Sequence, residues 1–482
     1  MENKLLAKNA LFNMLYKLLN VIIPLIAYMY VARALKPEGF GVAAAAQNNV
    51  TYFLILATLG IPAYGIREIA RNRNDVKELE RVFSELFFLN GILTTFAVVT
   101  LIAALLLFST FRDKGMLYLI YGCAVILNFF NVEWVYQGLE KYGYIAVRSI
   151  IIKLISLGLI VLFVHDLNDV YIYATISILD IAINYFVNII FLKGIVRFRW
   201  NTIHPLRHIK SLSYLALCTI STELYARIDV TMLDLMQNST QVGLYSYAHR
   251  VVNIAITFIA AITAVFLPRL NYYYEIDKLK FDQLVRFGMN LMIAVSIPAS
   301  VGVFFISKPI ILILFGDKFE MASVILRILV LMIPLKCIGD IVCYQVMMSA
   351  RQEKVLLKAY FIILAVNLIN NYILIPICGA KGAAAASVIS EILAILFVVR
   401  VSKRIVDFKP DKRNLACTMG ISFLIAGEMT FLLIINLPHI FVVIIGLLFA
   451  GIIFIIINIM AKNNIIMECL IVCKKRIIVS VK

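Results

Sequence analysis

Charged and titratable side chains stand inside long apolar stretches of this sequence, where a charge is costly. These residues are Glu223, Arg227, Asp229, His249, Arg250, Lys336 and Asp340. In a bilayer each charge costs at least about 2.5–3.5 kcal/mol on insertion scales, so it is kept only where it meets a partner or water. Cations in such places could bind an anion, because arginine offers two parallel N–H donors to a phosphate. Acids and histidine could instead bind a proton or Na⁺.

Spacing gives a plainer alternative, in which these charges pair with one another. Glu223 precedes Arg227 by four residues, which is the favourable order for an ion pair on one helix. Lys336 and Asp340 have the same spacing. Structural pairing and ligand binding therefore both stay open for these residues.

We predict a binding site for an anionic group in a central cavity between two halves of the chain. Its cations are Arg33, near the outer rim, with Arg227, Arg250 and Lys336. The candidates for H⁺ or Na⁺ coupling are Glu223, Asp229, His249 and Asp340. An arginine partner favours the charged form of a carboxylate, which argues against proton uptake by a paired acid.

Long apolar runs must position these residues. Of 482 residues, 62% are hydrophobic and 15% are charged, whereas a soluble protein is nearer about half apolar and about a quarter charged. Each run holds roughly 20 or more residues, enough for a helix to cross a bilayer, where backbone groups must pair within the helix. We therefore predict an all-α integral membrane protein with about 14 transmembrane helices. The runs lie at about 11–34, 40–64, 83–108, 116–138, 145–164, 169–192, 211–236, 242–267, 284–306, 322–348, 355–377, 380–399, 415–436 and 439–461.

The basic residues follow membrane topology. Lys and Arg number 45 against 28 Asp and Glu. Most of them, Lys141, Arg148 and Lys153 included, are assigned to alternate connections on one side, which is the positive-inside pattern and puts both termini in the cytoplasm. The opposite connections hold Arg33, Lys36, Arg112, Lys114, Lys308, Lys318, Arg327 and Lys381. Basic residues spread along one membrane face do not predict a nucleic-acid partner.

Enzyme and metal chemistry find no support in the sequence. The eight cysteines form no CxxC pair, so neither a disulfide framework nor a zinc site is predicted. His204 and His208 have a metal-ligand spacing, but Pro205 and the basic setting argue against a metal. There is no phosphate-binding loop, no GxSxG elbow and no polar connection long enough for a catalytic domain. We expect no enzyme activity, no cofactor and no metal.

The sequence looks like two similar halves. Residues 33–41 and 236–245 are each predicted to form a short outer turn in which glycine is followed by Phe or Tyr. Two similar six-helix bundles related by an axis normal to the membrane are a known transporter plan. The predicted divisions are a first lobe at 1–210, a second lobe at 211–404, two further helices at 405–461 and a basic cytoplasmic tail at 462–482. This amphipathic tail either lies on the inner leaflet or is loose.

Several short motifs occur in a fixed order. They are Asn20-x-x-x-Pro24, the stretch from Tyr30 to Gly41, Gly65 to Arg71, Gln137 to Glu140, Asp229, Val242 to Tyr245, Phe315 to Phe319, and Gly379 to Glu391. Together they resemble the bacterial polysaccharide repeat-unit flippases for O-antigen and capsule. That family shares a superfamily with multidrug and toxin extrusion transporters and with the lipid II flippase. One departure is Lys36, where the family pattern has glycine, and it bears on the geometry of the first outer turn.

The resemblance implies a substrate and a direction. The substrate would be an undecaprenyl-diphosphate-linked oligosaccharide, carried by alternating access to the outer leaflet of the bacterial cytoplasmic (inner) membrane. A polysaccharide polymerase and a chain-length regulator would be its partners. The sugar composition, the class of glycan and the coupling ion stay open.

Two rival functions remain. The first is a cation-coupled multidrug exporter of the same superfamily, against which a cavity rich in Arg and Lys argues. The second is a membrane-embedded polymerising enzyme, which would need a large outer loop that the sequence lacks.

Overall fold

The computed structural model describes residues 2–199, 204–263, 266–435, 437–461, 463, 465 and 467, with side chains from Ile22 onward except at 211, 214, 215 and 218. Every regular element within these ranges is a helix. The chain divides into two compact units, Met1–Gly243 and Leu244–Lys482. The predicted lobe boundary after residue 210 and the tail at 462–482 stay predictions, the tail lying almost wholly outside the described residues.

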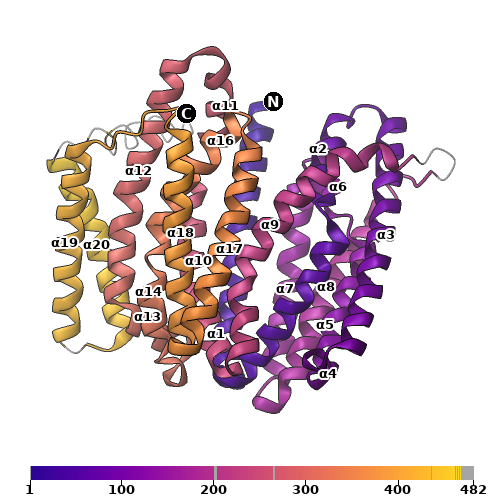
Figure 1. The fold of residues 1–482 in the computed structure, drawn as a ribbon, viewed down its shortest axis with the longest axis horizontal. Helices are drawn as coiled ribbons and strands as arrows, with labels where there is room; N and C mark the ends of the chain where they lie inside the picture. Colours follow the sequence, from indigo (N-terminus) through magenta and orange to yellow (C-terminus); the bar gives the residue numbers. More distant parts are fainter. Residues whose placement is uncertain are drawn as a thin grey trace. The chain divides into compact units, whose positions relative to one another are not determined.

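The described residues of the first unit form nine α-helices and the start of a tenth (Figure 1). These are α1 (Glu2–Thr58), α2 (Ile61–Arg71), α3 (Val76–Leu107), α4 (Ser109–Asp113), α5 (Gly115–Leu127), α6 (Glu133–Gly138), α7 (Tyr142–Phe163), α8 (Val170–Leu192), α9 (Leu206–Met236) and the beginning of α10 (Ser239–Thr263). Two 3₁₀ turns, η1 (Asn128–Phe130) and η2 (Leu167–Asp169), join neighbouring helices.

The second unit continues from α10. Its α-helices are α11 (Phe266–Ile276), α12 (Lys278–Phe305), α13 (Ser307–Phe315), α14 (Ala322–Leu329), α15 (Met332–Gly339), α16 (Val346–Ser349), α17 (Glu353–Cys378), α18 (Ala380–Ser402), α19 (Lys412–Ile434) and α20 (His439–Met460). A 3₁₀ turn, η4 (Asp317–Phe319), precedes α14, and a π-helical turn, η5 (Asp340–Gln345), joins α15 to α16. The predicted helix pair at 405–461 corresponds to α19 and α20, which pack against each other.

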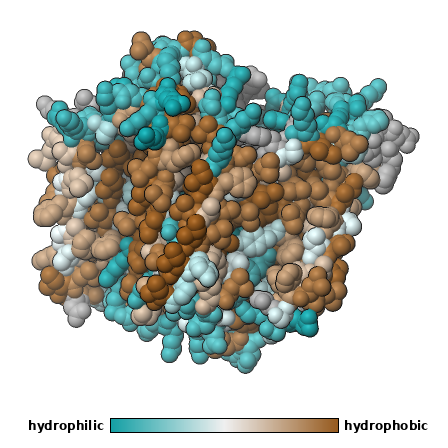
Figure 2. Space-filling view, in the orientation of Figure 1, coloured by the Kyte–Doolittle hydropathy of each residue, from teal (hydrophilic) through white to brown (hydrophobic). Residues whose placement is uncertain are grey.

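The membrane character predicted from composition is confirmed. Within the described residues, 11 helical segments are long and apolar enough to cross a bilayer. On the face shown in Figure 2, apolar side chains cover the middle of the helices of each unit and hydrophilic ones gather at the ends. The count of 14 stays a prediction, because one segment, Ile22–Arg71, covers two predicted spans, Gly115–Phe130 is shorter, and the charge-bearing α9 is not among the 11.

Helix α1 is two helices joined at a sharp turn. Lys36 has φ 56° and ψ 177°, so the helical path breaks there, where the sequence predicts an outer turn. This region of backbone space is essentially glycine's own, and another residue held there costs about 1–3 kcal/mol. Lys36 therefore adopts the conformation that the expected glycine would supply without strain.

A reciprocal contact joins this turn to the start of α10. A Cβ added to Gly41 would lie 1.7 Å from the carbonyl oxygen of Ser239, and one added to Gly243 would lie 2.1 Å from that of Pro37. Each glycine thus meets the residue four positions before the other glycine. This is the symmetry expected when two equivalent turns of a repeat pack together, and only glycine allows backbones so close.

Aspartates begin three of the long helices. Asp75 caps α3, Asp277 caps α12 and Asp411 caps α19, each side chain accepting backbone N–H bonds from the first turn. The N–H bond from Lys280 lowers the pKa of Asp277 below its usual value. These caps lie in the connections, where water is at hand and an aspartate is inexpensive.

An aromatic core holds one end of the first unit. Tyr64 of α2, Phe83 of α3 and Trp134 of α6 are buried in one cluster. Gly65 lies directly against the Trp134 ring, because a Cβ there would come within 2.5 Å of it. Figure 1 shows α2 and α6 beside each other near that end of α3.

Candidate functional site

In the first unit, polar side chains tie α1 to α9. The Asn48 amide donates to the Thr231 hydroxyl at 2.8 Å and to the backbone oxygen of Arg227 at 3.2 Å. The Tyr52 hydroxyl shares a 2.8 Å hydrogen bond with Thr231, which also donates to Asn49 at 3.0 Å. We call Asn48, Asn49, Tyr52 and Thr231 the α1–α9 network. It fixes the part of α9 that carries the predicted site residues.

An ion pair extends this network to α5. The Lys114 ammonium lies 2.7 Å from the carboxylate of Asp234, whose side chain is only 2% exposed. Asn49 also donates to Asp234, at 3.4 Å, and to the Tyr118 hydroxyl, at 3.0 Å. The sequence interpretation missed Asp234 and placed Lys114 simply in an outer connection. The one available signal was an acid near the end of an apolar run.

The predicted pair on α9 forms. Arg227 Nε lies 3.0 Å from Glu223, and both side chains are about a third exposed, at 32% and 39%. Asp229 is buried. The spacing argument is thus confirmed, and Arg227 carries a counterion while part of its guanidinium stays accessible. Arg33 is exposed on α1.

In the second unit, Lys336 of α15 pairs with Glu391 of α18 at 3.2 Å. Asp340 begins the π-helical turn η5 and accepts a 2.8 Å hydrogen bond from Gln345. π-Helical turns are rare and are frequently found at functional sites. The sequence interpretation considered Asp340 as the partner of Lys336 and took Glu391 for a lone helix-packing acid, because a partner on another helix leaves no local spacing signal.

His249 and Arg250 lie half-buried on α10. The His249 ring stacks on Tyr245, with centroids 5.6 Å apart and planes 14° apart. Asn253 lies 3.2 Å from its Nδ1 atom. Since Arg33 and Arg227 belong to the first unit and the two other predicted cations to the second, the convergence of all four stays a prediction.

Two basic residues assigned to a cytoplasmic connection lie on a spanning helix instead. Arg148 and Lys153 are both on α7. The buried Arg148 side chain pairs with Glu133 at 2.7 Å and donates to Asn188. Asp180, on α8, accepts from Ser156 at 3.0 Å. The assignment of these two residues to a connection was wrong, because the count of basic residues did not consider how far along the helix each one lies.

His208 has partners other than a metal. Its Nε2 lies 2.8 Å from Glu85, and its Nδ1 shares a 2.8 Å hydrogen bond with Tyr64. Arg207 also reaches Glu85, at 2.6 Å. Among the described residues, no group of three or more His, Cys, Asp or Glu could hold a metal ion. The His208 cluster ties the beginning of α9 to α2 and α3.

Comparison with known families decides the identity. A model of a family described as "Polysaccharide biosynthesis protein" matches residues 6–273, more than half of the chain. The chain belongs to this polysaccharide biosynthesis protein family. The "Putative O-antigen transporter" of Escherichia coli (strain K12) is 22% identical over 419 residues, which cover 84% of this chain and 99% of the relative.

Solved structures show the same fold. The "Lipid II flippase MurJ, inward closed conformation" superposes with a TM-score of 0.75 at 14% identity, covering 95% of this chain and all of that one. An inward-facing multidrug resistance MATE family transporter gives 0.63 at 17% identity, covering 81% and 94%. The family match and these relatives confirm the resemblance to polysaccharide flippases that the motifs suggested. The named relatives and structural neighbours are transporters and flippases, not enzymes.

Proposed function

We propose that this chain is a flippase that moves undecaprenyl-diphosphate-linked oligosaccharides from the inner to the outer leaflet of the bacterial cytoplasmic membrane. The observation that carries the proposal is the family match over residues 6–273. A relative named an O-antigen transporter, matched over nearly its whole length, supports it. The product would serve O-antigen or capsule synthesis, with a polymerase and a chain-length regulator as downstream partners.

The diphosphate is held by Arg33, Arg227, Arg250 and Lys336. Arg227 uses Nε for Glu223, which leaves its terminal nitrogens to fork onto a phosphate. The Lys336 side chain is 32% exposed beside Glu391, so its ammonium can be shared between a carboxylate and a ligand. The neighbouring acids reduce the positive charge, so binding stays reversible, as a carrier needs.

Transport proceeds by alternating access and is coupled to H⁺ or Na⁺. Of the candidates, Glu223 already pairs with Arg227. Asp340 is held by a neutral amide in a π-helical turn, and His249 by an asparagine and a tyrosine ring. Asp340 and His249 are therefore better placed for coupling than Glu223, and Asp229 is buried on the opposite side of α9 from Arg227.

The test replaces Arg250. In a strain that depends on this chain for surface polysaccharide, Arg250→Ala is expected to abolish polymer and Arg250→Lys to restore part of it, at equal protein level. Arg112→Ala is the matched control, since Arg112 is exposed and bonds only a nearby backbone oxygen among the described residues. Normal polymer in both Arg250 variants would remove this residue from the binding role.

Export of cationic drugs is the second candidate, favoured by the fold shared with the multidrug transporter. It predicts energy-dependent efflux of ethidium from cells that express the chain. Efflux without any effect on surface polysaccharide would replace the flippase proposal.

The orientation proposed has both termini in the cytoplasm. Reporters fused after Asp113 and after Arg199 are expected to give an outer and a cytoplasmic signal, respectively. The reverse pattern would overturn this orientation.

A further inference from the structure

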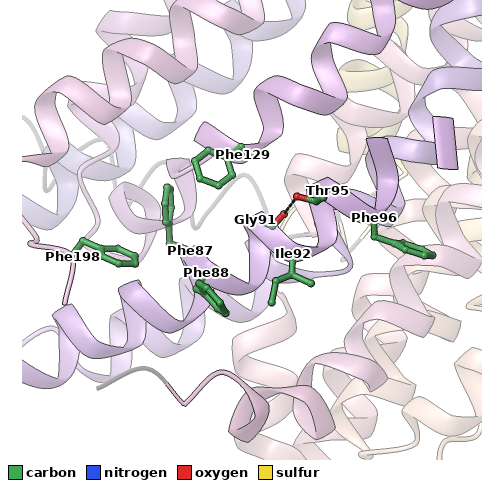
Figure 3. A pocket seen from close by; sticks show the side chains of 8 residues that line it. All are labelled: Phe87, Phe88, Gly91, Ile92, Thr95, Phe96, Phe129 and Phe198. Carbon is green, nitrogen blue, oxygen red and sulfur yellow. Dashed lines mark hydrogen bonds between the residues drawn. The ribbon is translucent and has the colours of Figure 1, made fainter. Parts of the chain in front are cut away.

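A pocket of about 660 Å³ opens on the first unit, beside α3 (Figure 3). Its lining residues are Phe87, Phe88, Gly91, Ile92, Thr95, Phe96, Phe129 and Phe198. Small-molecule pockets typically hold about 300–1,000 Å³. Five of the eight lining residues are phenylalanine and none is charged. Thr95, the one hydroxyl, donates to the backbone oxygen of Gly91 at 2.9 Å, so the ligand portion bound here must be hydrocarbon.

Contacts between the phenylalanine rings fix the walls of the pocket. Phe87 makes edge-on contacts with Phe129 of η1, at 5.0 Å between centroids, and with Phe198, at 5.7 Å. Gly91 makes room for the Phe129 ring, because a Cβ there would lie 2.9 Å from it. Edge-to-face contacts of this kind add about 0.5–1.5 kcal/mol beyond area burial, so the rings are held in place without a ligand.

Polar bonds behind the pocket clamp both walls to α3. Asn90 donates to the backbone oxygen of Asn128 at 2.8 Å, and Asn128 donates back to Asn90 at 3.1 Å, both side chains being buried. On the other wall, the Arg199 backbone N–H donates to Ser84, and its side chain lies 2.5 Å from Glu80. The pocket is therefore preorganised, which lowers the entropy cost of holding a chain in it.

The pocket adjoins membrane-facing residues of α3 and a basic stretch of the chain. Phe88, Ile92 and Phe96 line the pocket and are exposed on α3, a helix apolar enough to span the membrane. Arg197 and Arg199 flank the lining residue Phe198 in sequence, and Arg197 is exposed. A hydrocarbon site next to a basic connection complements an anionic lipid whose chain enters the pocket while its phosphate stays at the polar end.

We propose that this pocket binds the isoprenoid chain of a polyprenyl-phosphate carrier, and Arg197 its phosphate end. Methyl-branched, unsaturated isoprene units present flat, stiff edges that fit between phenylalanine rings, whereas a saturated acyl chain fits any apolar surface equally well. The inference rests on the proposed function, because that function supplies a polyprenyl-linked substrate. It adds a place where the lipid tail is held on this chain.

The test uses the purified full chain in nanodiscs. One probe is undecaprenyl phosphate with a diazirine on its chain, and the other is phosphatidylglycerol with a diazirine on its acyl chain. Mass spectrometry is expected to find the polyprenyl label between residues 87 and 96 or on 129, with little phosphatidylglycerol label there. Equal labelling by both probes, or polyprenyl labelling elsewhere only, would overturn the proposal.

Variants sharpen the test. Ile92→Trp fills the pocket and is expected to weaken polyprenyl labelling roughly tenfold, the loss that follows when about two buried chain carbons lose their contacts. Val99→Trp is the matched control, since Val99 is exposed two turns further along the same face of α3 and outside the pocket. The double variant Phe88→Ala/Phe96→Ala removes two exposed rings that line the pocket and should also weaken polyprenyl labelling. Unchanged labelling in both Ile92→Trp and this double variant would count against the pocket.

The two proposals fail separately. If cells carrying Ile92→Trp make normal polymer and the purified chain shows no pocket label, the pocket assignment fails while the flippase proposal stands. If the label maps to the pocket but deletion of the chain leaves surface polysaccharide unchanged, the flippase proposal fails and the lipid site stands.

Discussion

Two turns between helices of this protein make the same backbone contact by different local means. In the first, Lys36 takes a left-handed conformation between the two halves of α1. In the second, between α9 and α10, Gln237 has an ordinary negative φ of −133°, and the Asn238 side chain accepts from the backbone of Gln241 at 3.1 Å. The first turn therefore contains a strained residue, whereas the second is stabilised by a side-chain helix cap.

The difference separates two demands on a repeated structure. Both turns place a glycine a few residues beyond the bend, Gly41 after Lys36 in one and Gly243 after Gln237 in the other, and each glycine meets a backbone carbonyl. The bends themselves share no residue type. Packing between the turns requires glycine, because no shift of a side chain can relieve a clash between backbones. The bend itself is less restricted, since the two turns form it with different residues and different backbone angles.

The largest effect is expected from filling the reciprocal contact. Gly41→Ala and Gly243→Ala each place a methyl group inside a backbone carbonyl, at 1.7 Å and 2.1 Å. Overpacking typically costs about 1–3 kcal/mol and occasionally more, and here the obstacle is rigid, so about 3 kcal/mol or more is expected. Thermal unfolding of the purified protein in detergent would show a large fall in Tm or no folded yield.

Gly158→Ala is the control for those substitutions. Gly158 lies in α7 with nothing within 4 Å of an added Cβ. Alanine is favoured over glycine in a helix by about 1 kcal/mol, so this variant should be as stable as the parent or more so. A loss like that of the Gly41 variant would show that any helix glycine is sensitive and remove the special role of the contact.

A smaller gain is expected from relieving the first bend. Lys36→Gly places glycine at φ 56°, ψ 177°, and should stabilise the fold by about 1–2 kcal/mol. Gln237→Gly, at the equivalent bend, has no positive φ to relieve and should instead lose about 0.5 kcal/mol through a freer unfolded chain. Denaturant titration of both variants compares them, and gains of equal size would erase the contrast between the bends.

The smallest effect is expected at the cap of the second bend. Asn238→Ala removes the acceptor for the Gln241 N–H and should cost about 0.5–1 kcal/mol. Asn238→Asp keeps an acceptor and should be close to neutral. Since Asn238 is exposed, a loss above 2 kcal/mol, or one that the aspartate variant shares, would mean that the residue acts by something other than capping.

How much the sequence predicted depends on the distance between partners along the chain. The helical class, the two turns at 33–41 and 236–245 and the Glu223–Arg227 pair were all visible, because hydropathy and four-residue spacing are local signals. The Lys114–Asp234 pair joins residues far apart in sequence, and only the packed helices reveal it. Lys336 illustrates the same limit, since its partner lies on another helix.

Arg148 shows a second reason for failure. Charge counting assigns a basic residue near a helix end to the adjoining connection, and it cannot distinguish a solvated side chain from a buried one. The structure buries Arg148 against Glu133 and Asn188. A search for an acid near the end of the preceding apolar run would have raised the pairing as a hypothesis.

The reciprocal glycine contact can form only after the second turn has been synthesised. Gly41 and Ser239 are about 200 residues apart, and a ribosome adds about 5–20 residues per second, so the first turn waits roughly 10–40 s for its partner. During that interval the backbone around Pro37 and Gly41 lacks the second turn that it packs against in the folded protein. The newly made half must therefore be tolerated by the membrane and its quality-control proteases in an open form, and completion of α10 is the moment at which that exposure ends.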